Sequence, residues 1–258
     1  MSKKVFLNEF TAKELKEKLD NGMISSAITI FGACESHGWH LPLGPDIFVP
    51  TEIAKRTAER LEKTVVVPGI PFGTSIHYNH FPITISLDFD TNIKVAENIF
   101  ESLIQHKINN IVILNGHDGN IPVLEIAARN IKNKYKEATI IYIPAWWNIT
   151  GAKMPSDFKV WNGLGHGGEG ETSIVMAVRP DLVNLEDAES QMPHDMIKIN
   201  EFANVIFDIE EITTTGAIGD PTKATIEKGN KMLNIVTEYL VELITELEAK
   251  NWKYDYKK

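Results

Sequence analysis

The stretch that decides the fold is Asn110-Ile-Val-Ile-Leu-Asn-Gly-His-Asp-Gly-Asn120. Its residues 111–114 are apolar and mostly β-branched, which is typical of a buried strand. A polar turn bracketed by glycines follows, and then apolar residues at helical spacing from about Ile121 to Lys134. The stretch therefore predicts a strand that runs through a polar turn into a helix.

The same alternation of strand and helix recurs on both sides of this unit. A capping box at Thr11-Ala-Lys-Glu14 predicts the first helix, which Gly22 can close. Further strands are expected at 27–31, 64–67 and 139–143, and further helices at 50–62, 91–106, 172–178 and 222–250. Such alternation builds a largely parallel sheet covered on both faces. Because no linker interrupts the chain, we expect a single-domain, three-layer α/β/α fold over residues 1–258.

The composition narrows the class of protein. The net charge of −9 argues against a nucleic-acid partner and against an anionic membrane surface. A single cysteine, Cys34, excludes an internal disulfide and suits a reducing cytoplasm. The apolar run after Lys4 is too short for a signal peptide, and no stretch is long enough to span a membrane. We therefore expect a cytoplasmic globular protein.

The richest segment for chemistry runs from Cys34 to Asp46, directly after a predicted strand. Ligands of parallel sheets bind at the carboxyl ends of the strands, so this segment lies in the favoured place. In an extended chain Glu35 and His37 project to one side, and a carboxylate beside an imidazole suits Zn²⁺, Mn²⁺ or Fe²⁺. Asp46 follows a turn rich in proline and glycine that can fold it back, and His40 is a further ligand or supporting donor.

Two more clusters of acidic residues and histidines follow predicted strands or loops. The turn at 115–120 is expected to aim His117 inward. The other cluster, His166-Gly-Gly-Glu-Gly-Glu-Thr-Ser173, ends a long glycine-rich loop that starts at Gly151, and such loops are more often functional than idle. Glu169 and Glu171 both lie in it, and either can complete a metal site.

Each of these residues also has a purely structural interpretation. Any one histidine is more often a satisfied structural group than a ligand. Asp118 can simply cap a helix, and Glu171 can complement a helix dipole in the first turn. Cys34 is expected to be a buried small residue rather than a nucleophile. The coincidence of three clusters at strand-to-helix junctions favours a metal site.

These residues resemble the creatininase (creatinine amidohydrolase) family from about Val5 through the C-terminal helix. The family pattern Glu-x-His-Gly-x-His…Asp is matched by Glu35, His37, His40 and Asp46. The other matching segments are Asn79-His-Phe-Pro82 with Ser86-Leu87, Asn115-Gly-His-Asp-Gly-Asn120, His166 to Ser173, and Gly219-Asp-Pro-Thr222 with Glu227-Lys-Gly229. Because all of them occur in the family's order, the resemblance is specific.

The resemblance implies a centre of two divalent cations, with zinc expected and manganese or iron as alternatives. Asp46 would bridge the two ions, with Glu35 and His117 on one ion and His37 on the other. A metal-bound hydroxide would attack the substrate carbonyl, while His166 would steer or protonate the leaving nitrogen. We expect His166 and Glu171 to be the catalytic residues. The resemblance also implies a homo-oligomer, usually a hexamer.

One departure separates this chain from the creatininases proper. They carry Asn-Gly-His-x-Glu-Asn, and its glutamate completes the second metal site, whereas this chain has Gly119 at that position. They also lack a glutamate at the position of Glu169 and carry one where this chain has Gly165. We hypothesise that Glu169 supplies the missing carboxylate. The chain would then be a divergent member, and creatinine itself would be a doubtful substrate.

Four residues are expected to bind a small-molecule substrate: His80, Trp147, Trp161 and Asp118. Trp147 aligns with a tryptophan of the creatininases, although core packing explains a tryptophan equally well. His77 and His80 precede the Phe-Pro turn and are both candidate pocket residues, of which His80 matches the family better.

The leading hypothesis is a metal-dependent hydrolase of an amide-type C–N bond in a small substrate, with a cyclic amide preferred over a linear one. Two alternatives use the same site, namely hydrolysis of a cyclic keto-inositol and deformylation of a formamidopyrimidine nucleotide. A non-enzyme alternative is a protein that binds metal without turnover.

Overall fold

The computed structural model describes residues 3–158, 164–193 and 205–254. In that part of the chain one sheet has the strand order β2-β1-β3-β4. Its strands are β1 (Ser26–Phe31), β2 (Thr64–Val66), β3 (Asn110–Asn115) and β4 (Thr139–Ile143). All neighbouring pairs are parallel, and residues 26–31 of β1 pair in register with residues 110–115 of β3. The expected α/β fold with a parallel sheet is confirmed.

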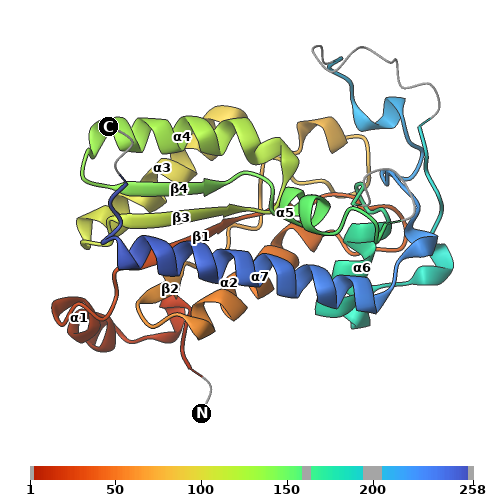
Figure 1. Cartoon of the computed structure of the whole chain (residues 1–258). Helices are drawn as coiled ribbons and strands as arrows, with labels where there is room; N and C mark the ends of the chain where they lie inside the picture. Colours follow the sequence, from red (N-terminus) through yellow and green to blue (C-terminus); the bar gives the residue numbers. More distant parts are fainter. Residues whose placement is uncertain (1–2, 159–163, 194–204, 255–258) are drawn as a thin grey trace.

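Helices cover both faces of the sheet (Figure 1). The α-helices are α1 (Ala12–Asp20), α2 (Pro45–Arg60), α3 (Phe89–Gln105), α4 (Ile121–Lys134), α5 (Trp146–Lys153), α6 (Glu169–Val178) and α7 (Ile226–Ala249). Because strand side chains alternate between faces, Ile28 and Ile30 of β1 join the core under α2 and α7, while Ala27 and Phe31 join the core under α3 and α4. None of the described helices is long and apolar enough to cross a bilayer.

The helix starts differ from the expected ones by three or more residues in three places, and α3 begins two residues early, at Phe89 rather than at residue 91. The helix expected from Pro50 begins at Pro45, so Pro50 lies inside α2 and Asp46 lies in its first turn. The helix expected from residue 172 begins at Glu169. The last helix begins at Ile226 rather than at residue 222, because the Thr225 side chain accepts a hydrogen bond from the Lys228 amide and so caps it. The first helix starts at its capping box as expected.

Helices α6 and α7 pack so closely that they leave no room for a side chain at Gly229. A Cβ added there would lie 1.9 Å from the carbonyl oxygen of Ser173. The Ser173 hydroxyl donates to the Glu169 carbonyl at 2.6 Å and accepts from the Thr225 amide at 3.0 Å. The start of α7 is therefore fastened to the start of α6, where two acidic candidate residues lie.

We predict that Gly229→Ala lowers the free energy of unfolding by about 1–3 kcal/mol, because the helices must separate to admit a methyl group. Gly151→Ala is the matched control, since a Cβ at Gly151 meets nothing within 4 Å. In α5 that control should raise stability by up to about 1 kcal/mol, through the higher helix propensity of alanine. Urea unfolding followed by circular dichroism measures both. Equal effects of the two substitutions would contradict the close packing.

Candidate metal centre

The candidate ligands lie at the carboxyl edge of the sheet, where the loops that follow parallel strands converge. Glu35 and His37 follow β1, and His117 follows β3. Asp46 and Glu171 lie in the first turns of α2 and α6. Segments far apart in the sequence therefore meet beyond the strand ends, on the side where α5 and α6 lie (Figure 1).

Two groups of ligand atoms share Asp46. In one group, Nδ1 of His117 lies 3.2 Å from Oε1 of Glu35 and 3.2 Å from Oδ2 of Asp46. In the other group, Nε2 of His37 lies 3.2 Å from Oδ1 of Asp46 and 3.5 Å from Oε1 of Glu171. The two carboxylate oxygens of Asp46 thus face different histidines, which is the arrangement that a bridging ligand needs.

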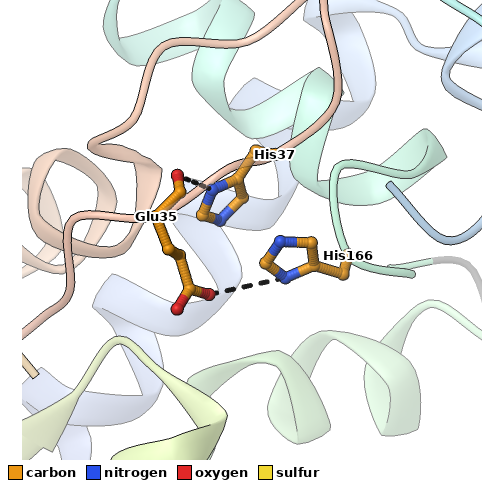
Figure 2. A group of neighbouring side chains, drawn as sticks. All are labelled: Glu35, His37 and His166. Atoms are coloured by element: carbon orange, nitrogen blue, oxygen red, sulfur yellow. Dashed lines mark hydrogen bonds and ion pairs between the residues drawn. The ribbon is translucent and has the colours of Figure 1, made fainter. Parts of the chain in front are cut away.

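His166 lies beside both groups. Its ring stacks on the ring of His37, with centroids 4.0 Å apart and planes 28° apart. Its Nδ1 lies 3.9 Å from Oε1 of Glu35. Figure 2 shows these three side chains turned toward one another. Since Glu35, His37 and His166 form a third group of potential ligands, His166 is close enough either to bind a cation or to act on a molecule held beside one.

Backbone carbonyls fix the orientation of all three histidine rings. Nδ1 of His37 lies 3.1 Å from the Glu35 carbonyl oxygen, and Nε2 of His117 lies 2.9 Å from that of Thr74. Nε2 of His166 lies 2.7 Å from the carbonyl oxygen of Ser36. A carbonyl can only accept a hydrogen bond, so each of these nitrogens donates its proton. Each ring then turns its other nitrogen toward the carboxylates, as histidines that bind metals do.

Side-chain amides hold the loops that carry these carbonyls. Asn115 donates to the His117 carbonyl at 2.6 Å and accepts from the His117 amide at 3.2 Å, which bends the chain after β3. Oδ1 of Asn120 accepts from the Thr74 amide at 2.9 Å, and its Nδ2 donates to the Gly32 carbonyl at 3.0 Å. The polar turn expected to aim His117 inward is thus tied both to the loop after β1 and to the loop that holds the His117 ring.

The residues present fit divalent cations. Glu35 is fully buried, and neither its carboxylate oxygens nor Oδ2 of Asp46 accept a well-aligned hydrogen bond. The one group that faces them is Nδ1 of His117, which lies 3.2 Å from Oε1 of Glu35 and 3.2 Å from Oδ2 of Asp46. An unsatisfied buried polar atom costs roughly 1–3 kcal/mol, and more when the group is charged. Buried carboxylates are therefore paired or coordinate metals. A cation between these oxygens and Nδ1 of His117 would satisfy them.

The charged groups of the cluster strongly shift one another's pKa values. Burial alone would lower the pKa of His37, but the carboxylates of Glu171 and Asp46 raise it well above its usual value. Burial likewise opposes the charged form of His117, whose pKa Glu35 and Asp46 raise. Without a cation, both histidines therefore carry protons that balance the carboxylates.

Glu169 points away from these groups. It is 1 % exposed, and its Oε1 lies 2.5 Å from Nζ of Lys228 on α7. The structure therefore brings Glu171, and not Glu169, to His37 and Asp46. His40 is also outside the three groups. Its Nε2 lies 2.8 Å from the Thr172 hydroxyl, and burial together with the charge of His37 lowers its pKa to about 4.

A cavity of about 1170 Å³ opens over the cluster. Asp118 and Trp147 line it together with Glu35, Asp46, His117, His166 and Glu171. His80 is not among the residues that line it; its side chain is 57 % exposed and lies 3.0 Å from Glu210. Trp161 lies outside the described residues. The structure thus brings two of the four residues expected to bind substrate to the cluster.

Tyr78 is a residue of the site that the sequence did not reveal. It is 3 % exposed, lines the cavity, and lies with its ring 4.5 Å from the ring of His166. It ends a short 3₁₀ turn, Ile76–Tyr78, for which the sequence has no periodic signal. The family motif in this segment begins with the neighbouring residues Asn79 and His80, but both of them are exposed.

Comparison with known proteins finds relatives that match most of the chain. Residues 8–244 match the family model "Creatininase: Creatinine amidohydrolase". The creatinine amidohydrolase of Pseudomonas putida is 28 % identical over 95 % of this chain and 98 % of its own length. A mycofactocin precursor peptide peptidase of Mycobacterium tuberculosis (strain ATCC 25618 / H37Rv) is 25 % identical over 85 % and 84 %. The 3-dehydro-scyllo-inosose hydrolase of Thermotoga maritima is 24 % identical over 94 % and 83 %.

Solved structures show the same relationship. A putative creatinine amidohydrolase from Bacteroides fragilis superposes with a TM-score of 0.84 at 27 % identity and covers all of both chains. A structure described as "Creatininase Mn" superposes with a TM-score of 0.80 at 27 % identity, over 95 % of this chain and 98 % of that one. The family model spans most of the chain, so the chain belongs to the creatininase family, whose members are metal-dependent amidohydrolases.

Proposed function

We propose that this chain hydrolyses an amide-type C–N bond at a centre of two divalent cations. Glu35, Asp46 and His117 would hold one cation, and His37, Asp46 and Glu171 the other. The observation that carries the proposal is the set of buried carboxylate oxygens of Glu35 and Asp46 that accept no well-aligned hydrogen bond. Zinc is the expected metal, with manganese or iron as alternatives.

The cations, when bound, would lower the pKa of a water molecule and polarise the substrate carbonyl. The protein would supply orientation and proton transfer. His166 donates from Nε2 to the Ser36 carbonyl, so its Nδ1 is the nitrogen that can exchange protons at the centre. Burial lowers the pKa of His166 below its usual value of 6.5, so that nitrogen is unprotonated at neutral pH. It can accept a proton and then donate it to the leaving nitrogen.

The cavity favours a peptide-like amide as a second candidate substrate. Its volume of about 1170 Å³ exceeds the range of about 300–1,000 Å³ that drug-sized ligands fill. Phe89, Trp147, Phe158 and Phe207 line it, so an amide with an apolar group beyond the reacting bond would fit. A relative described as a peptide peptidase agrees with this candidate. Trp147 and Asp118 remain the proposed substrate-binding residues.

The oligomeric state and the cellular compartment of the protein are also proposed. We expect a cytoplasmic homo-oligomer, a hexamer by family resemblance, acting on a small molecule without nucleic-acid or membrane partners.

The function is tested with a panel of creatinine, a short apolar peptide, a formamidopyrimidine nucleotide and a keto-inositol, assayed with Zn²⁺ and with Mn²⁺. We predict turnover of an amide, and a loss of about 100-fold or more in kcat for His166→Asn. Metal content of this variant, measured by mass spectrometry, should equal that of the wild type. Turnover of the keto-inositol alone would favour the ketone hydrolase, and bound metal without any turnover would favour the non-enzyme alternative.

Glu171 and Glu169 are the two candidates for the carboxylate that completes the second cation site. We predict that Glu171→Gln reduces bound metal from two ions toward one per chain, because the ligand facing His37 is weakened. Glu169→Gln is the matched control: it breaks the ion pair with Lys228 and should lower stability while two ions remain bound. Mass spectrometry of metal and protein measures the ratio. The opposite pattern would restore Glu169 as the ligand.

Metal binding should release protons at pH 7. The pKa values of His37 and His117 are raised in the cation-free protein, and both rings must lose a proton to bind a cation. Calorimetric titration in buffers of different ionisation enthalpy should therefore give different apparent enthalpies. The release should diminish as the pH rises through the raised pKa values. A binding enthalpy that is independent of the buffer at pH 7 would contradict this charge balance.

A further inference from the structure

Gly119 is the position where this chain departs from the creatininases, and the structure shows that no side chain fits there. A Cβ added to Gly119 would lie 2.1 Å from the Thr74 carbonyl oxygen and 2.6 Å from Nε2 of His117. These two atoms lie 2.9 Å apart and form the hydrogen bond that orients the His117 ring. The absence of a side chain at position 119 therefore lets the loop before His77 approach the centre.

The ring of His77 occupies the adjacent space. Its Cε1 would lie 3.0 Å from a Cβ at Gly119. The ring lies parallel to that of His117, with planes 10° apart and centroids 5.9 Å apart. His77 also lines the cavity that contains the cluster. A second imidazole thus lies against the Glu35–Asp46–His117 group, beside Gly119, the position at which the creatininases carry a glutamate.

The nitrogens of His77 have different hydrogen-bonding surroundings from those of the other histidines around the centre. His37, His117 and His166 each donate to a backbone carbonyl. Within the described residues, the ring of His77 contacts the rings of Tyr78 and His117 and makes no hydrogen bond or ion pair. The ring is half-buried in a cavity wall. An imidazole there offers a donor or an acceptor to whatever molecule the cavity holds.

We propose that His77 is a substrate-contacting, specificity-determining residue, which hydrogen-bonds a polar group of the substrate lying over the Glu35–Asp46–His117 group. The proposal rests on the proposed function, because it takes this cavity to be the hydrolytic site. Positions 77 and 119 would act as a pair: with glycine at 119, a polar ring reaches the centre from the loop after β2. The simpler alternative is that the ring only packs over Gly119.

Two substitutions separate hydrogen bonding from packing. His77→Phe keeps a ring and removes both nitrogens, whereas His77→Gln keeps a donor and an acceptor. His106→Phe, in an exposed histidine at the end of α3, is the control. The probe is acetohydroxamate, a small amide-like metal ligand, titrated into the Co²⁺-loaded protein and followed by visible absorption. KM and kcat are measured in parallel with whichever panel amide is hydrolysed.

We expect His77→Phe to weaken hydroxamate binding and raise KM by about three- to tenfold, the effect of one lost hydrogen bond. His77→Gln should recover part of the loss, and metal content and the midpoint of thermal unfolding should match the wild type. Equal losses in both variants, no loss in either, or loss of bound metal would assign His77 to packing and overturn the inference alone. A metal-loaded wild type that binds no hydroxamate and hydrolyses no panel member would overturn the proposed function, and the inference with it.

Discussion

Asp46 lies in the first turn of α2, and its two carboxylate oxygens face His37 on one side and His117 on the other. The backbone around it is as constrained as its side chain. Pro50 has no amide proton, so it cannot complete the helical hydrogen bond to the Asp46 carbonyl. That carbonyl lies against Gly116 and Gly32, where an added Cβ would approach it to 2.0 Å and 2.6 Å. The loops after β1 and β3 can reach the centre only because glycines lie where they pass α2.

The sequence indicated which candidate residues lie together better than it indicated the elements that carry them. Glu35, His37 and His117 follow strands, and the rule that loops converge at the carboxyl edge of a parallel sheet places them without any knowledge of contacts. Asp46 was expected after a turn, whereas it lies inside a helix. Two prolines five residues apart each suit the first turn of a helix, and apolar periodicity does not distinguish between them. Only the tertiary structure, which places the Asp46 carboxylate at the centre, decides at which proline the helix begins.

Glu169 and Glu171 show where local reasoning from the sequence fails. In a loop, both carboxylates could reach the centre. The structure places them in the first turn of α6, where residues two apart point to nearly opposite sides because each residue turns the helix by about 100°. Glu171 then faces His37, while Glu169 faces Lys228 on α7. The helix begins three residues before the position expected from the sequence, and local sequence signals do not fix a helix boundary that closely. Tyr78 escapes prediction for a similar reason, because it lies in a short 3₁₀ turn without periodicity.

The carboxylates and imidazoles of the cluster shift one another's pKa values. Glu35 and Asp46 are buried, and burial by itself raises the pKa of both carboxyl groups. The histidines beside them reverse this effect and lower both values, because each imidazole takes up a proton in exchange. Protons on His37 and His117 therefore serve as the counter-charge in the cation-free chain. A divalent cation would have to displace these protons, so the ion pairs between imidazoles and carboxylates would compete directly with metal binding. Acid should thus weaken metal affinity well before it unfolds the protein, since the carboxylates keep their charge to lower pH than the imidazoles keep their metal.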